Sequence, residues 1–98
     1  MIEKRNIRGV EHTIEIVMSA LKHGKTKEDI FFVLDNIVYD EMIDDDPEKT
    51  LSIGFDANAR LTELISHEAE GHYIVIFHAM PCRKEYVGEL IKEITWRD

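Results

Sequence analysis

The chain has 98 residues, of which 44% are hydrophobic and 33% are charged. This composition is typical of one small folded domain and excludes a disordered or collagen-like chain. No apolar run approaches the ~20 residues of a membrane-spanning helix, and the first residues lack the apolar stretch of a secretory signal, so we expect a cytoplasmic protein without a membrane partner. Cys82 is the only cysteine, which excludes an internal disulfide and a four-cysteine zinc site.

The net charge of −8 comes from 20 acidic and 12 basic residues, and at first it argues against a nucleic-acid partner. The excess is local, because residues 35–48 contain seven acids and no base. Such a run is usually a solvated loop or strand edge. The alternative is a docking surface for a basic partner, whose candidate residues are Asp44, Asp45 and Asp46.

The first part of the chain predicts a flexible arm followed by two helices. Residues 1–8 show no period and are assigned to the arm. In residues 10–21 apolar side chains recur at three- and four-residue spacings, which predicts an amphipathic helix that ends at Gly24. Thr26 and Asp29 have the spacing of a capping box and predict a second helix ahead of Ile30.

The rest of the chain predicts a sheet and a closing helix. Residues 39–43 favour a short edge strand, residues 51–55 and 61–66 a hairpin, and residues 73–80 the most buried strand. Residues 86–94 have the period of a helix that packs on the sheet. We therefore predict one α+β domain over residues 1–98, with two N-terminal helices, an antiparallel sheet of three or four strands and a C-terminal helix packed on it.

Several chemical classes lack their required residues. His67 and His72 are five residues apart, about 140° around a helix, whereas the zinc-protease motif needs a spacing of four. Residues 44–48 lack the alternating ligands and central glycine of a calcium loop. The chain has no glycine-rich phosphate loop and no serine in a nucleophile-elbow context. We therefore expect no metal and no cofactor.

Residues 78–84 (HAMPCRK) are the most informative segment. They place His78, Arg83 and Lys84 where the buried strand leads into the last helix, a suitable arrangement for binding phosphate and moving protons. This chemistry suits metal-independent RNA cleavage, in which a ribose 2′-hydroxyl attacks the phosphate. In the alternative interpretation His78 is a core residue on the same sheet face as Ile74 and Ile76, and Arg83 only pairs with an acid. Cys82 also has two interpretations. Its basic neighbours could lower the pKa of the thiol and activate it, but a packing role is more usual for a single cysteine.

Three segments resemble BrnT-like toxins of the RelE/ParE-like superfamily of toxin–antitoxin systems. They are residues 22–30 (KHGKTKEDI), residues 53–56 (IGFD) followed by Arg60 and Leu61, and residues 78–84 (HAMPCRK). The resemblance implies a small ribonuclease with two helices, a sheet and a final helix, neutralised by a cognate antitoxin with which it could form an oligomer. The acidic net charge and the last helix, with Glu85, Glu89 and Glu93, depart from the basic pattern of such toxins. A non-catalytic protein-binding member of the same fold is therefore the alternative.

The resemblance also implies roles for individual residues. His78, Arg83 and His23 are the implied catalytic residues, with the two histidines transferring protons and Arg83 contacting phosphate. Arg60, Lys22 and Lys84 are the implied RNA- or phosphate-binding residues. The expected partners are the antitoxin protein and RNA.

Overall fold

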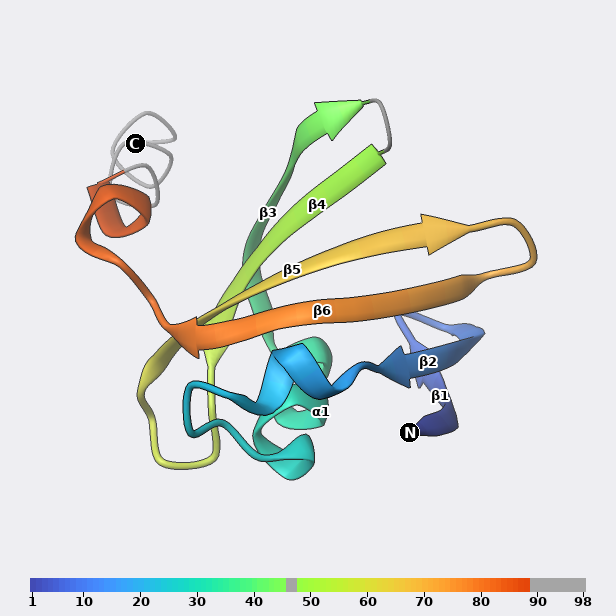
Figure 1. Cartoon of the computed structure of the whole chain (residues 1–98), viewed down its shortest axis with the longest axis horizontal. Helices are drawn as coiled ribbons and strands as arrows, with labels where there is room; N and C mark the ends of the chain where they lie inside the picture. The colour runs from blue at the N-terminus through green and yellow to red at the C-terminus, as the bar shows by residue number, and fades with distance from the viewer. Residues whose placement is uncertain (46–47, 89–98) are drawn as a thin grey trace.

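The computed structural model describes residues 1–45 and 48–88, and in these ranges it shows one six-stranded mixed sheet, an α-helix after the second strand and the helical residues 84–88 (Figure 1). The predicted fold class is therefore wrong: the domain is mostly β and does not begin with two helices. In chain order the elements are β1 (Ile2–Ile7), β2 (Val10–Ile16), the 3-10 helix η1 (Met18–Leu21), α1 (Lys27–Asp35), β3 (Ile37–Asp45), β4 (Glu48–Phe55), β5 (Leu61–Ala69) and β6 (Tyr73–Pro81).

A β-hairpin replaces the expected arm and first helix. β1 and β2 are antiparallel, and Ile7 pairs with Val10 across the two-residue turn Arg8–Gly9. Both turn residues have positive φ values, 52° and 87°, which is the conformation that matches the twist of a two-residue hairpin. The apolar residues of β2 alternate, with Ile14 and Ile16 both buried. The β-branched residues of this segment therefore follow a strand period, and only η1 remains of the predicted helix.

The second predicted helix is present as α1. The Thr26 side chain accepts a hydrogen bond from the Asp29 amide, and the Asp29 carboxylate accepts one from the Thr26 amide. This capping box confirms the predicted start of the helix. The helix ends at Asp35, and β3 begins at Ile37.

The strands after α1 occur where the sequence predicts them, but most are longer. The sheet order is β1-β2-β6-β5-β4-β3, so β3 is an edge strand and β6 lies in the interior of the sheet. β3 to β6 are antiparallel neighbours, whereas β2 and β6 are parallel, with Thr13 opposite Tyr73. Residues 84–88 are helical. The remainder of the predicted closing helix lies outside the described residues.

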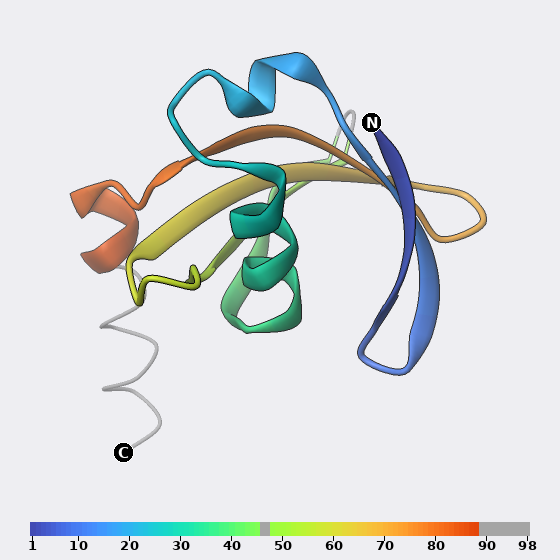
Figure 2. The same cartoon turned by 90° about the horizontal axis from the view of Figure 1, so that it is seen from below.

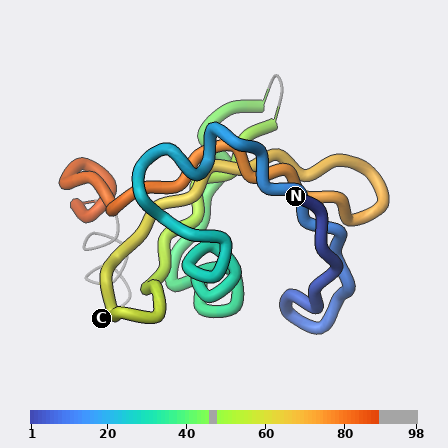
Figure 3. Tube along the Cα trace, turned by 60° about the horizontal axis from the view of Figure 1, so that its bottom comes forward, coloured from blue at the N-terminus to red at the C-terminus, as the bar shows by residue number. Residues whose placement is uncertain are grey.

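The main core lies on the face of the sheet that α1 covers (Figure 2). Figure 3 shows that the β1–β2 hairpin curves toward this same side. Buried residues of α1, of η1 and of four strands form the cluster: Ile7, Ile14, Ile16, Ala20, Ile30, Phe31, Val33, Leu34, Leu64, Ile76 and Ala79. α1 approaches β4 closely, since a Cβ at Gly54 would be 2.7 Å from the Asn36 main-chain oxygen. Glycine is therefore the residue that this contact accommodates.

A bulge in β6 changes which side chains face this core. Ile65 pairs with His78 and the next residue, Ser66, pairs with Ile76, so Phe77 is an extra residue in the ladder. Because side chains alternate between the two faces, one extra residue reverses the faces of all that follow. Ala79 therefore joins Ile76 in the core, and His78 is turned to the opposite face. The interpretation of His78 as a core residue beside Ile74 and Ile76 is wrong for this reason.

Candidate functional site

A buried carboxylate is the centre of the candidate site. Glu63 lies on β5 opposite Met80 of β6, and its side chain is fully buried. It lies on the same face as His78, since both belong to the face turned away from α1. A buried ionised carboxylate is costly unless charged and polar partners satisfy its oxygens.

Arg83 supplies most of that compensation. Its Nε lies 3.1 Å from both carboxylate oxygens of Glu63, its Nη2 lies 2.9 Å from Oε2, and its main-chain amide donates to Oε1 at 2.8 Å. Nη2 also contacts the Tyr86 hydroxyl at 3.1 Å. Burial alone would raise the pKa of Glu63, but the hydrogen bonds from Arg83 and His78 outweigh it and hold that pKa below its usual value. The same contacts raise the pKa of Arg83.

Two histidines complete the cluster. His78 Nε2 lies 3.0 Å from Oε2 of Glu63, and since an ionised carboxylate only accepts, this nitrogen carries a proton. The ring of His23 packs edge-on against His78, with 5.6 Å between the centroids. His78 is partly buried and His23 is exposed. The fold thus brings His23, His78 and Arg83 together through Glu63, although the chain separates them widely.

A second buried ion pair holds the loop that carries His23. Lys25 Nζ lies 2.9 Å from Oδ2 of Asp56, and both residues are buried. Asp56 also accepts hydrogen bonds from the amides of Asn58 and Arg60, which shape the β4–β5 turn. Burial would raise the pKa of Asp56, but these bonds from Lys25 and the turn amides keep it lowered. The loop after η1 is therefore fixed to the β4–β5 turn two residues beyond His23.

The remaining predicted RNA-binding residues are exposed around these elements. Lys22 precedes His23, Arg60 lies in the β4–β5 turn and Lys84 follows Arg83. Within residues 1–45 and 48–88 none of the three side chains forms an ion pair. They are the cations available to an anion near the cluster.

Cys82 is not an activated thiol. Burial, together with the negative charge of Glu63, raises its pKa to about 11, although Arg83 opposes this. Its Sγ lies 3.7 Å from the Arg83 main-chain oxygen. The idea that basic neighbours could activate this thiol is therefore wrong, because burial and the charge of Glu63 outweigh the opposing effect of Arg83.

His67 and His72 take part in separate contacts. His67 Nδ1 lies 2.7 Å from the Glu48 main-chain oxygen, and the His72 ring packs edge-on against His12. Among the residues that the structure describes, no group of three histidine, cysteine or acidic side chains is arranged to hold a metal ion.

The predicted partner-docking residues lie on the edge of the sheet. Asp44 and Asp45 are exposed on β3, and Asp46 lies outside the described residues. Exposed Val38, Met42 and Ile43 lie on the same strand. β3 thus combines negative charge with apolar side chains.

Sequence reasoning missed Glu63, Lys25 and Asp56. The available signal was Glu63 itself, a carboxylate between Thr62 and Leu64 inside a strand. A charged residue at such a position needs a buried partner, and the nearest basic segment after the neighbouring strand contains Arg83.

In comparisons with known proteins, no family model, curated protein or solved structure matches the chain. In the described part of the chain, every helix is too short or too polar to cross a membrane.

Proposed function

We propose that the protein is a metal-independent ribonuclease of the toxin class that its sequence resembles, and that the cluster around His78 is its catalytic site. The observation that carries the proposal is the contact between His23 and His78 beside the Arg83–Glu63 pair. Two imidazoles next to a guanidinium are the groups that cleavage by a ribose 2′-hydroxyl requires.

The hydrogen bond to Glu63 suggests which histidine removes the proton. Glu63 holds a proton on Nε2 of His78, which leaves Nδ1 of the neutral ring free to accept one. His78 accepts the 2′-hydroxyl proton as the 2′-oxygen bonds to phosphorus. The protonated His23 ring donates a proton to the 5′-oxygen as the P–O5′ bond breaks. The products are a 2′,3′-cyclic phosphate and a free 5′-hydroxyl.

Arg83 has a second role in this scheme. Its Nε and Nη2 bind Glu63, while Nη1 lies 3.7 Å from Glu85 Oε1, too far for a hydrogen bond. Nη1 therefore retains donors for a phosphate oxygen while the rest of the guanidinium holds the site together. Lys22, Lys84 and Arg60 add positive charge for the RNA backbone.

The test is cleavage of a short single-stranded RNA at low salt in the presence of a chelator. We expect His23→Gln to reduce the rate by about a hundredfold or more, the usual contribution of a proton-transfer group. His23 is exposed, so the variant should melt as the unmodified protein does. His67→Gln, a histidine outside the cluster, is the matched control and should retain full activity. Equal rates for both variants, or a linear rather than cyclic phosphate product, would contradict the proposal.

A non-catalytic protein-binding role is the second candidate, and one observation favours it. The guanidinium of Arg83 donates most of its hydrogen bonds to a buried acid, and β3 presents acidic and apolar side chains together. Under this alternative the purified protein neither binds nor cleaves RNA at low salt, while a basic antitoxin associates with it. Replacing Asp44, Asp45 and Asp46 by asparagine should then slow association and flatten its salt dependence. Unchanged association kinetics would exclude this surface.

A further inference from the structure

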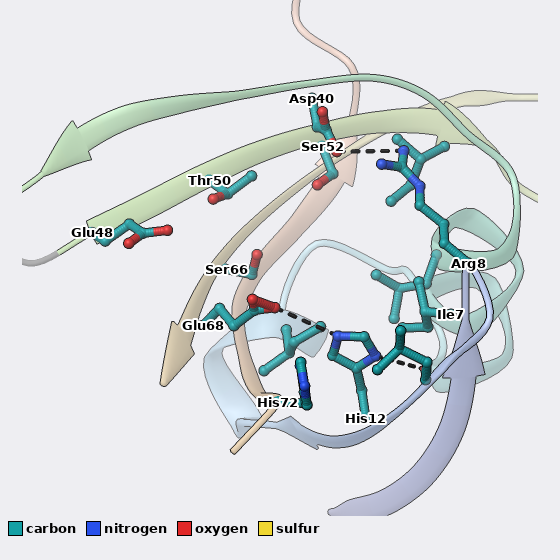
Figure 4. A pocket seen from close by; sticks show the side chains of 14 residues that line it. Ile7, Arg8, His12, Asp40, Glu48, Thr50, Ser52, Ser66, Glu68 and His72 are labelled. Carbon is teal, nitrogen blue, oxygen red and sulfur yellow. Dashed lines mark hydrogen bonds and ion pairs between the residues drawn. The ribbon is translucent and has the colours of Figure 1, made fainter. Parts of the chain in front are cut away.

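A groove on the α1 face of the sheet contains a second set of polar residues (Figure 4). It has a volume of about 390 Å³ and lies between the β1–β2 hairpin, α1 and the strands β3 to β6. This volume is within the ~300–1,000 Å³ of small-molecule sites. None of its lining residues belongs to the His23–His78–Glu63–Arg83 cluster. The groove is therefore independent of the proposed ribonuclease site.

Three hydroxyl groups line the groove without a hydrogen-bond partner among residues 1–45 and 48–88. Thr50 and Ser66 face each other across β4 and β5, and Ser52 is two residues farther along β4. Ser52 is 5% exposed and Ser66 9% exposed. None of the three side chains hydrogen-bonds to a residue that the structure describes, and Figure 4 shows them around the groove. No fully buried side-chain nitrogen or oxygen of the described residues lacks a partner, so these hydroxyls open onto the groove, where a bound ligand can hydrogen-bond to them.

A histidine and a carboxylate also face each other at the groove. His12 Nδ1 lies 2.9 Å from the Val10 main-chain oxygen, and because a carbonyl only accepts, Nδ1 carries a proton. His12 Nε2 lies 3.5 Å from Glu68 Oε1, which is longer than an ordinary hydrogen bond. The Glu68 carboxylate therefore retains acceptor capacity for a donor bound in the groove. The His72 ring packs against His12 and fixes its orientation.

The acidic residues that line the groove favour a positively charged hydrogen-bond donor as the ligand. Three acids, Asp40, Glu48 and Glu68, face a single arginine, Arg8, which is already within 3.5 Å of Asp40. Ile74 and Leu34 form an apolar part of the wall. We propose that the groove binds an organic cation, an alkylammonium or alkylguanidinium group. Its charged end would lie against Glu68, and its alkyl part against Ile74. A free polyamine and an arginine side chain share this chemistry.

The experiment measures calorimetric binding of n-butylguanidinium to the full chain at low salt, with n-butanol as the neutral control. We expect saturable binding of the cation, weakened by added salt, and none of the alcohol. Glu68→Gln should weaken binding about tenfold or more, because it removes a charge-assisted hydrogen bond. Glu70→Gln, which removes an equal charge from the exposed β5–β6 turn, is the matched control and should bind within twofold of the unmodified protein.

A second variant and an NMR spectrum distinguish a loss of binding from a loss of folding. Ser66→Ala removes only a hydroxyl and should also weaken binding, and amide chemical shifts should move at Ser66, Glu68 and Ile74. Spermidine and a capped arginine peptide, titrated in parallel, distinguish the two sources, and tighter binding of either supports the proposal. The absence of binding to all three cations would overturn it, as would equal losses in Glu68→Gln and Glu70→Gln.

Discussion

Arg83→Met is the substitution whose cost the structure defines best. The methionine keeps much of the side-chain bulk but removes every hydrogen bond from the guanidinium to Glu63, which is fully buried. Breaking one side of a buried ion pair costs about 3–5 kcal/mol, because the remaining charge has no compensation. The Arg83 side chain is 40% exposed, so water can reach part of the pair and we expect the lower end, about 3 kcal/mol.

Urea denaturation at neutral pH measures this loss. With a slope of about 1.5 kcal/mol per molar urea, a loss of about 3 kcal/mol lowers the midpoint by roughly 2 M. Arg83→Lys should recover only part, since an ammonium cannot bind both carboxylate oxygens in one plane. Glu63→Gln should cost less than Arg83→Met, because the guanidinium left behind can reach water. A change within about 0.5 kcal/mol for Arg83→Met, typical of a surface residue, would refute the reasoning.

Acid provides an independent check on the same pair. The lowered pKa of Glu63 means that its contribution to stability is complete above its ordinary value of 4.5 and disappears as the pH falls through the lower folded value. In Arg83→Met the unpaired carboxylate has no reason to stay ionised. Burial without Arg83 raises the pKa of this carboxyl, so the difference in stability between the two proteins should begin to shrink above pH 4.5 and should continue to shrink until the pH reaches the lowered pKa of the paired carboxyl. A difference that stays constant to lower pH would show that Glu63 is not the group involved.

Three further predictions concern other parts of the fold. Lys25→Met leaves the buried Asp56 carboxylate without its cation, and we expect a loss of about 3 kcal/mol in urea denaturation. Gly54→Ala places a methyl group 2.7 Å from a main-chain oxygen at the end of α1, and thermal denaturation should show a loss of about 1–3 kcal/mol. Cys82, with a pKa of about 11, should react with iodoacetamide at pH 8 roughly a hundredfold more slowly than a free cysteine peptide; a rate equal to that of the peptide would contradict its burial.

Local chemical signals in the sequence were sufficient for α1 and for the strands after it. Thr26 and Asp29 specify a helix start that depends on neighbouring atoms only. The prediction for the first part of the chain was wrong because two periodicities overlap there. Val10, Ile14 and Val17 fit a helical period, but Ile16 fits only a strand, and the turn at Arg8–Gly9 decides between them. Two periodicities coexist in that segment, and the pairing of β2 with β6, which is distant in the chain, selects one.

The candidate site was predictable as a set of residues but not as a geometry. The segment containing His78 and Arg83 carried its chemistry in its residue types, and the structure brings these residues together with His23. The orientation of His78 depends on the extra residue Phe77 in the β6 ladder, and a single sequence gives no register for a bulge. The pairing of Arg83 with Glu63 could not be predicted either, because Glu63 lies on a different strand and the sequence does not show which strands are neighbours.

The parallel pairing of β2 with β6 has a consequence for the order in which the chain folds. Strands β3 to β6 form a continuous antiparallel meander from local connections. Among the described strands, the β1–β2 hairpin joins the sheet through β6, which follows all the others in the chain. An isolated two-stranded hairpin is marginally stable in water, and contacts between distant segments slow folding. Docking of the β1–β2 hairpin should thus be a late kinetic step, because β1 and β2 are synthesised before the strand that holds them in the sheet.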